Sequence, residues 1–200
     1  MRKVILSMMM SLDGFAAGPN GEMDWLPPFD DEEKWRDLHE EMWKQLKGID
    51  TFLLGRVTYQ QWEYYWPAAA KNPKSTRSDI DFSRFADETQ KVVFSKTLNE
   101  VHWKNSRLVK GDIAEEIGRM KQMPGKDIAL AGGAGLARTF IKLGLVDDYL
   151  FTVHPVILGT GKSLFKDLEE RRRLRLVEAR TLNPGAVLLH YQPQAGGANL

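Results

Sequence analysis

The sequence predicts an α/β protein with a mostly parallel sheet that is covered by helices on both faces. Short apolar segments typical of buried strands alternate along the chain with amphipathic segments typical of helices. Near the C-terminus, two β-rich segments follow each other directly, which predicts an antiparallel pair. Hydrophobic residues make up 42% and charged residues 28% of the 200 residues, as in ordinary globular domains.

Each predicted strand is a short run of apolar and β-branched residues that is followed by glycine or polar turn residues. Continuous apolar runs of this kind favour parallel strands that are buried on both faces. The predicted parallel strands are Val4–Met9, Thr51–Leu54, Val92–Ser95, Arg107–Val109, Ile128–Ala131 and Asp148–Val156. The predicted antiparallel pair is Arg173–Arg180 and Ala186–Tyr191, joined by Asn183-Pro184-Gly185.

Apolar residues that recur at three- and four-residue steps predict the helices. The first predicted helix, Asp30–Lys47, carries Trp35, Leu38, Met42 and Leu46 on one face. Asp112 is a predicted N-cap for a later helix. Further helices are predicted over Val57–Tyr65 and after Gly135. The polar segment Ala68–Ser83, which contains Pro73, is predicted to be a long loop.

Composition excludes several classes of function. The formal net charge of +1 provides no field that would attract nucleic acid or an anionic membrane. The absence of cysteine removes disulfides, thiolate catalysis and cysteine zinc sites, and we predict no metal site. No apolar run is long enough for a transmembrane helix or a signal peptide. We therefore expect a cytoplasmic protein with one domain over residues 1–193 and a flexible tail over residues 194–200.

The most informative motif is the glycine turn Gly132-Gly133-Ala134-Gly135, which lies between a predicted strand and a predicted helix. Such a turn lets the backbone approach a ligand closely and directs free N–H groups and the positive helix end at an anion, usually phosphate. The spacing differs from the GxGxxG dinucleotide motif. The alternative interpretation is a tight turn that only needs small residues.

Ligands of parallel sheets bind at the carboxyl ends of the strands. The predicted topology therefore brings the corners after several strands to one edge of the sheet. These corners are Ser11–Gly14, Gly55-Arg56, Ser95-Lys96 and Gly132–Gly135, with Leu158–Gly161 as a further candidate.

Five motifs in this order resemble those of the dihydrofolate reductase-like family. They are Ser11–Phe15, Gly55–Tyr59, Val93–Thr97, Gly132–Gly135 and His154–Gly161. The nearest branch contains the reductase domain of bacterial riboflavin biosynthesis, the C-terminal domain of RibD. The resemblance runs from about Lys3 to Tyr191. It implies a three-layer α/β/α sandwich, binding of NADPH, reductase activity and a homodimer.

The resemblance also implies cofactor contacts at particular positions. Residues 55–58 match a corner that contacts cofactor phosphates, residues 95–96 match the turn that holds the 2′-phosphate, and residues 132–135 match the turn over the pyrophosphate. The implied cofactor-binding residues are Gly55, Arg56, Thr58, Ser95, Lys96, Gly132, Gly133, Ala134 and Gly135. Arg56 could instead form a surface ion pair, and Lys96 could lie along the sheet edge.

Two aspartates are candidate catalytic residues. The segment Met23–Asp30 resembles the mobile active-site loop of folate-reducing members, in which a tryptophan precedes the site's acidic residue by five positions, and this implies Asp30. A carboxyl group in an apolar pocket beside Trp25 could supply a proton. Alternatively, Asp30 and Glu33 have the spacing of a helix capping box. Asp13 could contact the substrate or the nicotinamide, or could be a turn residue.

The function we predict is an NADPH-dependent reductase that transfers a hydride to a small heterocyclic or carbonyl-containing substrate. One rival is a riboflavin-pathway pyrimidine reductase, for which Lys71, Lys74 and Arg77 could supply a cationic pocket. The other is an NADP(H)-binding sensor or partner-binding protein without catalysis. We expect His154 to be a hydrogen-bonded strand histidine rather than a catalytic one.

Overall fold

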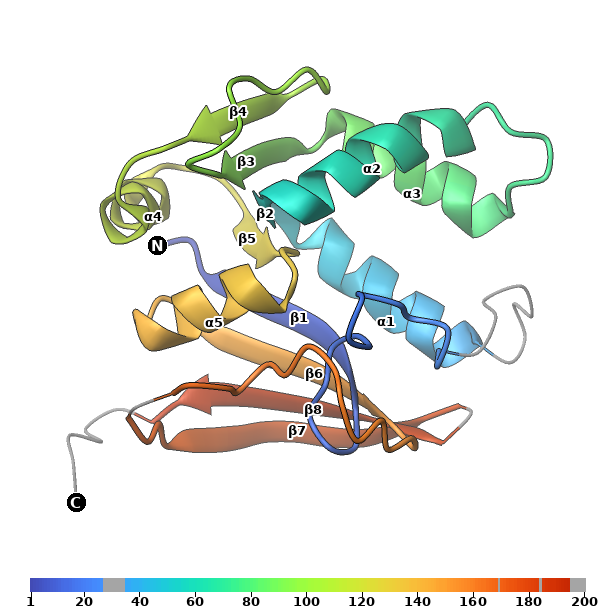
Figure 1. The fold of residues 1–200 in the computed structure, drawn as a ribbon, viewed down its shortest axis with the longest axis vertical. Coiled ribbons are helices and arrows are strands. Elements are labelled where there is room, and N and C mark those ends of the chain that lie inside the picture. The colour runs from blue at the N-terminus through green and yellow to red at the C-terminus, as the bar shows by residue number, and fades with distance from the viewer. Residues whose placement is uncertain (27–34, 169, 184, 195–200) are drawn as a thin grey trace.

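The computed structural model describes residues 1–26, 35–168, 170–183 and 185–194. In these residues eight strands form one mixed sheet in the order β4-β3-β2-β5-β1-β6-β8-β7 (Figure 1). Neighbours from β4 to β6 are parallel, whereas β8 and β7 are antiparallel to their neighbours. The strands are β1 (Val4–Ser11), β2 (Ile49–Gly55), β3 (Gln90–Phe94), β4 (Ser106–Val109), β5 (Asp127–Leu130), β6 (Asp148–His154), β7 (Leu174–Leu182) and β8 (Ala186–Pro193).

Helices cover both faces of this sheet, which confirms the predicted three-layer α/β/α fold class (Figure 1). One face carries α1 (Arg36–Lys47), α2 (Arg56–Ala69) and α3 (Arg77–Glu88). The other carries α4 (Ile113–Gln122) and α5 (Ala134–Lys142). None of the helices in the described part of the chain is long and apolar enough to cross a membrane.

Side chains of the central strands point alternately to the two faces of the sheet, and they contribute to a hydrophobic cluster on each face. On β2, Leu53 packs with the α4 and α5 layer, and its neighbours Phe52 and Leu54 pack with α1, α2 and α3. Successive side chains of a strand point to opposite faces, so an apolar run such as Phe52–Leu54 is what a sheet buried on both faces requires.

The long loop predicted over Ala68–Ser83 is wrong, because α2 continues to Ala69 and α3 begins at Arg77. Thr76 and Asp79 form a capping box in which the Thr76 hydroxyl accepts the Asp79 N–H at 3.1 Å. Phe82 and Ala86 then bury the face of α3 that packs on the sheet. The segment is polar overall, but it contains an amphipathic helix whose N-terminus is marked by this capping box.

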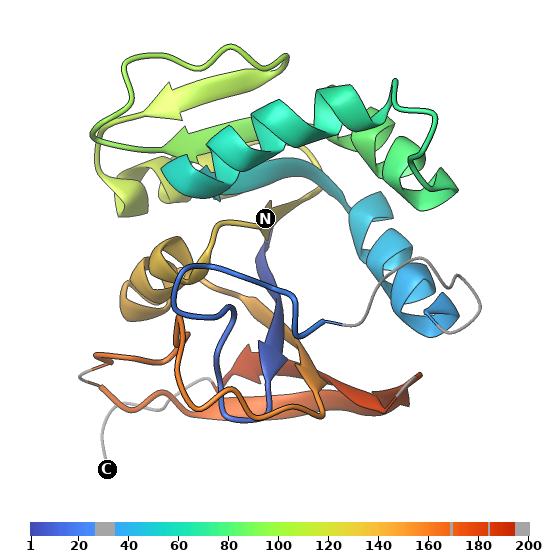
Figure 2. The same cartoon turned by 45° about the vertical axis from the view of Figure 1, so that its right-hand side comes forward.

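The helix predicted from Asp30 is described from Arg36 onward, and positions 30–34 lie outside the described residues. The predicted antiparallel pair is confirmed as the long β7–β8 hairpin, which lies along one end of the sheet (Figure 2). Of the predicted tail, only Gln194 is described, and its N–H donates to the Arg173 carbonyl at 3.0 Å.

The buried carboxylate of Asp148 ties three parts of the sheet together at the amino end of β6. It contacts the Lys3 ammonium at 3.0 Å, the His190 ring at 2.6 Å and the Gln192 amide at 2.7 Å. Burial alone would raise the pKa of Asp148, but the hydrogen bonds from Gln192, His190 and Lys3 outweigh it and lower the pKa below its usual value. Asp148 is therefore ionised in the folded protein at neutral pH.

We expect Asp148→Asn to lower the free energy of unfolding at pH 7 by about 2–3 kcal/mol, because His190 and Gln192 lose a charged hydrogen-bond acceptor in a buried position. A carboxyl whose pKa is lowered by folding stabilises the protein above its unfolded pKa of about 3.9, and this stabilisation is lost as the pH falls through the folded pKa. Urea unfolding of parent and variant between pH 7 and 2.5 measures both free energies of unfolding, and their difference should shrink as the pH falls. The control Asp81→Asn removes an exposed ion pair with Arg77 and should change stability by only about 0.3–0.5 kcal/mol. Equal losses in the two variants would contradict the prediction.

Candidate functional site

The parallel strands β3, β2, β5, β1 and β6 are neighbours in this order, so their carboxyl ends share one edge of the sheet. Four predicted corners follow these strands and are thereby brought to that edge. In spatial order they are Ser95-Lys96, Gly55-Arg56, Gly132–Gly135 and Ser11–Gly14.

The helices α2 and α5 begin side by side at the centre of this edge (Figure 1). Gly55 occupies the N-cap position of α2 and Gly133 that of α5, and the Gly133 N–H donates to Thr58 Oγ1 at 3.1 Å. Neither helix has a side-chain cap or an acidic residue in its first turn. Two helix N-termini therefore present N–H groups and positive dipole ends to the same region, which is a suitable environment for an anion.

The glycines of the β5–α5 turn are required for space. A Cβ on Gly132 would lie 2.6 Å from Leu136 Cδ2 and 3.3 Å from the Gly55 backbone nitrogen. At Gly135, by contrast, a Cβ would meet nothing within 4 Å. Neither residue has a positive φ. Gly132 thus allows the turn to approach α2, and Gly135 leaves an open surface beside the helix end.

The predicted basic residues Arg56 and Lys96 follow β2 and β3, the two strands next to β5 on one side. Arg56 is exposed, and its Nη1 lies 3.4 Å from the Gln60 amide oxygen. No carboxylate in the described part of the chain pairs with Arg56. Lys96 is also exposed. The Ser95 hydroxyl accepts the N–H groups of Thr97 and Leu98 at 3.2 and 3.0 Å, so it stabilises the turn after β3.

Asp13 is held within the turn after β1. Its carboxylate accepts hydrogen bonds from the Ser11 hydroxyl at 2.6 Å and from the N–H groups of Leu158 and Gly159 at 3.1 and 2.7 Å. The Ser11 hydroxyl, with help from the two N–H groups, lowers the pKa of Asp13. An ionised carboxylate with three donors fits the turn interpretation better than proton donation. The other candidate acid, Asp30, lies outside the described residues.

The segment after β1 packs against the segment after β6. The Ala16 N–H donates to the Lys162 carbonyl at 3.0 Å, and the Lys162 N–H donates to the Ala17 carbonyl at 2.8 Å. A Cβ on Gly161 would lie 2.3 Å from the Ala17 carbonyl oxygen, and Gly161 has φ +152°. These contacts fix the loop that borders the carboxyl edge beside β1.

His154, the last residue of β6, differs from the expected hydrogen-bonded strand histidine. It is 3% exposed, yet its Nε2 has no hydrogen-bond partner among the residues that the structure describes. Burial lowers the pKa of His154, so the imidazole is neutral at pH 7. The expectation was wrong because the residues around the ring, including Trp25 and Trp35, are aromatic.

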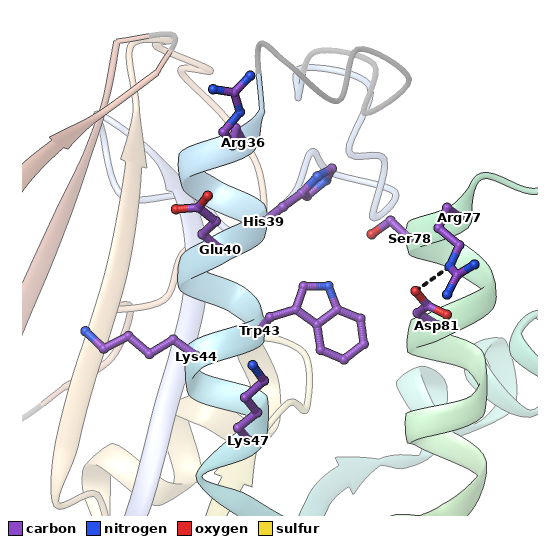
Figure 3. Close-up of a pocket in the computed structure, with 9 residues that line it drawn as sticks. All are labelled: Arg36, His39, Glu40, Trp43, Lys44, Lys47, Arg77, Ser78 and Asp81. Carbon is purple, nitrogen blue, oxygen red and sulfur yellow. Dashed lines mark hydrogen bonds and ion pairs between the residues drawn. The ribbon is translucent and has the colours of Figure 1, made fainter.

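Away from this edge, a hollow lies between α1 and α3 and has a volume of about 970 Å³ (Figure 3). His39 and Trp43 of α1 point toward Ser78 and Arg77 of α3. Of the three cations proposed for a phosphate pocket, only Arg77 lines this cleft, and it is paired with Asp81 at 2.8 Å. The cleft therefore does not assemble the Lys71, Lys74 and Arg77 cluster. Among the described residues, no group of three or more acidic or histidine side chains could hold a metal ion.

We expect Gly132→Val to lower the free energy of unfolding by about 2–4 kcal/mol, because its side chain would overlap Leu136 and the Gly55 backbone. Gly135→Val places the same side chain in open space and should unfold within about 1 kcal/mol of the parent. Chemical denaturation of both variants checks this. Similar destabilisation of the two proteins would show that the open surface at Gly135 is misassigned.

Comparison with known proteins places these features in a family. The family model described as the RibD C-terminal domain matches residues 2–188. Two similar proteins come from Bacillus subtilis (strain 168), and both bear the name of uncharacterized proteins. YyaP is 39% identical over 190 residues, covering 95% of this chain and 94% of the relative. YwjB is 30% identical over 192 residues, covering 95% of this chain and 97% of the relative.

Solved structures share the fold at low sequence identity. A putative riboflavin biosynthesis protein from Shewanella sp. PV-4 superposes with a TM-score of 0.70 at 20% identity, covering 96% of this chain and 99% of that one. A diaminohydroxyphosphoribosylaminopyrimidine deaminase/5-amino-6-(5-phosphoribosylamino)uracil reductase from Thermotoga maritima gives 0.65 at 16% identity, covering 96% of this chain but 57% of its own. The chain therefore spans little more than half of that bifunctional protein. With the sheet order, the paired helix starts and the family match in agreement, the chain belongs to the RibD C-terminal domain family and has a dihydrofolate reductase-like fold.

Proposed function

We propose that the protein is an NADPH-dependent reductase that transfers a hydride to a small heterocyclic or carbonyl-containing substrate. The observation that carries the proposal is the pair of uncapped helix N-termini, at Gly55 and Gly133, joined by the hydrogen bond from Gly133 to Thr58. Two such termini at the carboxyl edge of a parallel sheet suit the phosphates of a dinucleotide. The family assignment supports the same interpretation.

The described residues fit such a cofactor. The open surface at Gly135 and the exposed guanidinium of Arg56 would hold the pyrophosphate, and Lys96 at the next strand end would hold the 2′-phosphate. Thr58 would act by fixing the glycine turn, since its hydroxyl already accepts the Gly133 N–H. When bound, NADPH would supply the hydride, and the chain would orient the substrate and exclude water.

We expect NADPH to bind at least about tenfold more tightly than NADH, because one charge-assisted contact to the extra phosphate contributes about 1.5–3 kcal/mol. Calorimetry with both cofactors measures the ratio. Lys96→Gln should reduce the preference and leave NADH affinity unchanged. Lys104→Gln is the matched control, because Lys104 is paired with Glu88 at 2.6 Å on the loop before β4. Gly135→Val should weaken both cofactors. Equal affinity of the parent for NADPH and NADH would contradict the proposal that Lys96 binds the 2′-phosphate.

Hydride addition to a C=N or C=O bond also requires a proton, and Asp30 is the proposed donor. We expect Asp30→Asn to lower turnover by roughly 10²–10⁴-fold, because asparagine cannot donate a carboxylic proton. NADPH affinity should stay the same. Asparagine caps helices about as well as aspartate, so a capping role alone would leave turnover at the parental level. Steady-state kinetics on a substrate found by loss of nicotinamide absorbance provides the measurement.

The second candidate function is NADP(H) binding without catalysis, as in a sensor or partner-binding protein. The hydrogen bonds of Asp13 favour binding without catalysis. This candidate catalytic carboxylate is ionised and already accepts three hydrogen bonds inside the chain. A screen of carbonyl, pterin and pyrimidine substrates separates the two functions. Tight NADPH binding without turnover of any of them would favour the sensor.

We further propose that the protein forms a homodimer through the β6–β8–β7 end of the sheet. β7 is the last strand of the sheet, and Leu176 and Val177 on it are 49% and 43% exposed. An exposed apolar edge strand needs cover. Sedimentation at micromolar concentration should give about twice the 22.8 kDa chain mass, and Val177→Lys should shift the protein toward the monomer. A parent that sediments as a monomer would contradict the proposal.

A further inference from the structure

Two consecutive side chains in the first turn of α2 hold the loops on either side of it. Thr58 accepts the Gly133 N–H and so holds the glycine turn that follows β5. Tyr59, the next residue, contacts the loop between β3 and β4. Because β2 leads into α2 and lies between β3 and β5, the first turn of α2 separates the glycine turn from the loop that begins with Ser95 and Lys96.

The phenol of Tyr59 makes three hydrogen bonds. Its oxygen accepts the N–H groups of His102 and Trp103, each at 3.0 Å. Its hydroxyl donates to Glu63 Oε1, one turn further along α2, at 2.7 Å. Burial, and then the hydrogen bond to Glu63, raise the pKa of Tyr59, so the phenol keeps its proton at neutral pH. The hydroxyl therefore acts as donor and acceptor at the same time.

These hydrogen bonds lie within the hydrophobic core. Tyr59 is 1% exposed and Trp103 is 6% exposed. Leu98 and Val101, from the same loop, pack against the hydrophobic cluster that contains both rings. Loss of the phenol oxygen would leave the buried Trp103 N–H without its acceptor, which is costly. The hydroxyl thus favours one position of the loop on α2.

Other contacts keep the loop folded at both ends. At its start, the Ser95 hydroxyl accepts two N–H groups of the following turn. At its end, the Trp103 indole N–H donates to Asp87 Oδ1 of α3 at 2.9 Å. Removal of the Tyr59 hydroxyl should therefore leave a folded loop that is less firmly fixed to α2.

The position of this loop matters for Lys96, which is exposed and lies directly after Ser95. A lysine ammonium is a point charge on a flexible stem, so the side chain by itself defines no fixed geometry. The strength of its contact with a phosphate depends on where the backbone of the loop lies.

We propose that Tyr59 is a positioning residue for cofactor selectivity. Through the β3–β4 loop it sets the distance between Lys96 and the glycine turn, so that the ammonium meets the 2′-phosphate while the glycine turn holds the pyrophosphate. This inference rests on the proposed function, which assigns the two phosphates to these two places. Tyr59 itself is buried and acts on the cofactor through the loop.

Tyr59→Phe tests this role because it removes the hydroxyl and keeps the ring. Calorimetry with NADPH and NADH measures both affinities. We expect the preference for NADPH to fall by about three- to tenfold, as for one weakened charge-assisted contact, and the NADH affinity to stay within about twofold of the parent. Tyr64→Phe is the matched control, since it makes the same change at an 85% exposed residue of the same helix, and it should keep the parental ratio. A folded Tyr59→Phe protein with the parental preference overturns the proposal.

A double-mutant cycle separates positioning from a general loss of stability. Since Tyr59 acts through Lys96, Tyr59→Phe should lower the preference for NADPH no further once Lys96→Gln is present. A structural role alone would lower the melting temperature and would weaken both cofactors equally, with or without Lys96. Equal weakening of the two cofactors in both backgrounds contradicts the proposal.

Hydrogen exchange in the parent gives a test that needs no variant. Coupling between sites is reciprocal, so a 2′-phosphate that depends on the position of the loop should also stabilise the loop. We expect the Trp103 amide to exchange about threefold or more slowly with saturating NADPH than with saturating NADH, with amides of the β7–β8 hairpin as the reference. Equal exchange rates with the two cofactors overturn the proposal. A parent that binds neither cofactor refutes the proposed function and this role with it, whereas a parent that prefers NADPH without these effects refutes this role alone.

Discussion

The candidate site depends on the close approach of the β5–α5 turn to the first turn of α2. This approach is possible because Gly132 has no side chain to meet Leu136 and the Gly55 nitrogen. The hydrogen bond from the Gly133 N–H to Thr58 then fixes the two helix starts relative to each other. Since α2 and α5 lie on opposite faces of the sheet, only their first turns can meet, and they meet at the carboxyl edge. The proposed anion site would therefore be a consequence of how two crossover helices are brought together across the sheet.

The two edges of the sheet differ in how completely their polar groups are satisfied. At the amino edge, Arg2 pairs with Asp50, Lys3 with Asp148 and Lys121 with Asp147. At the carboxyl edge, the described part of the chain provides no side-chain cap for α2 or α5 and no partner for the ring nitrogens of Trp25 and His154. Unpaired polar groups lower stability, so the ion pairs at the amino edge offset the stability that is lost at the carboxyl edge. Such a division is expected where one edge is structural and the other binds ligands.

The parallel strands, the closing hairpin and the glycine corner could be predicted because their signals are local: apolar runs, turn residues and a strand–glycine–helix pattern. The helix α3 was missed because its capping box, Thr76 and Asp79, lies in a segment that is polar overall. The state of His154 could not be predicted at all. Its surroundings come from Trp25 and Trp35, which are distant in the chain and meet it only in the folded sheet. For the same reason the donors to Asp13, the Leu158 and Gly159 N–H groups, carry no signal in the sequence.

The central position of β1 has a consequence for synthesis on the ribosome. This strand precedes the other strands of the sheet in the chain, yet its two neighbours are β5 and β6, and the contact from the Val4 N–H to Asp147 joins positions 143 residues apart. Until β5 leaves the exit tunnel, neither side of this apolar strand has its partner, and the second side is paired only after β6 follows. Non-local pairing of this kind slows folding and exposes aggregation-prone segments. The central sheet of this domain can therefore be completed only after β6 has been synthesised.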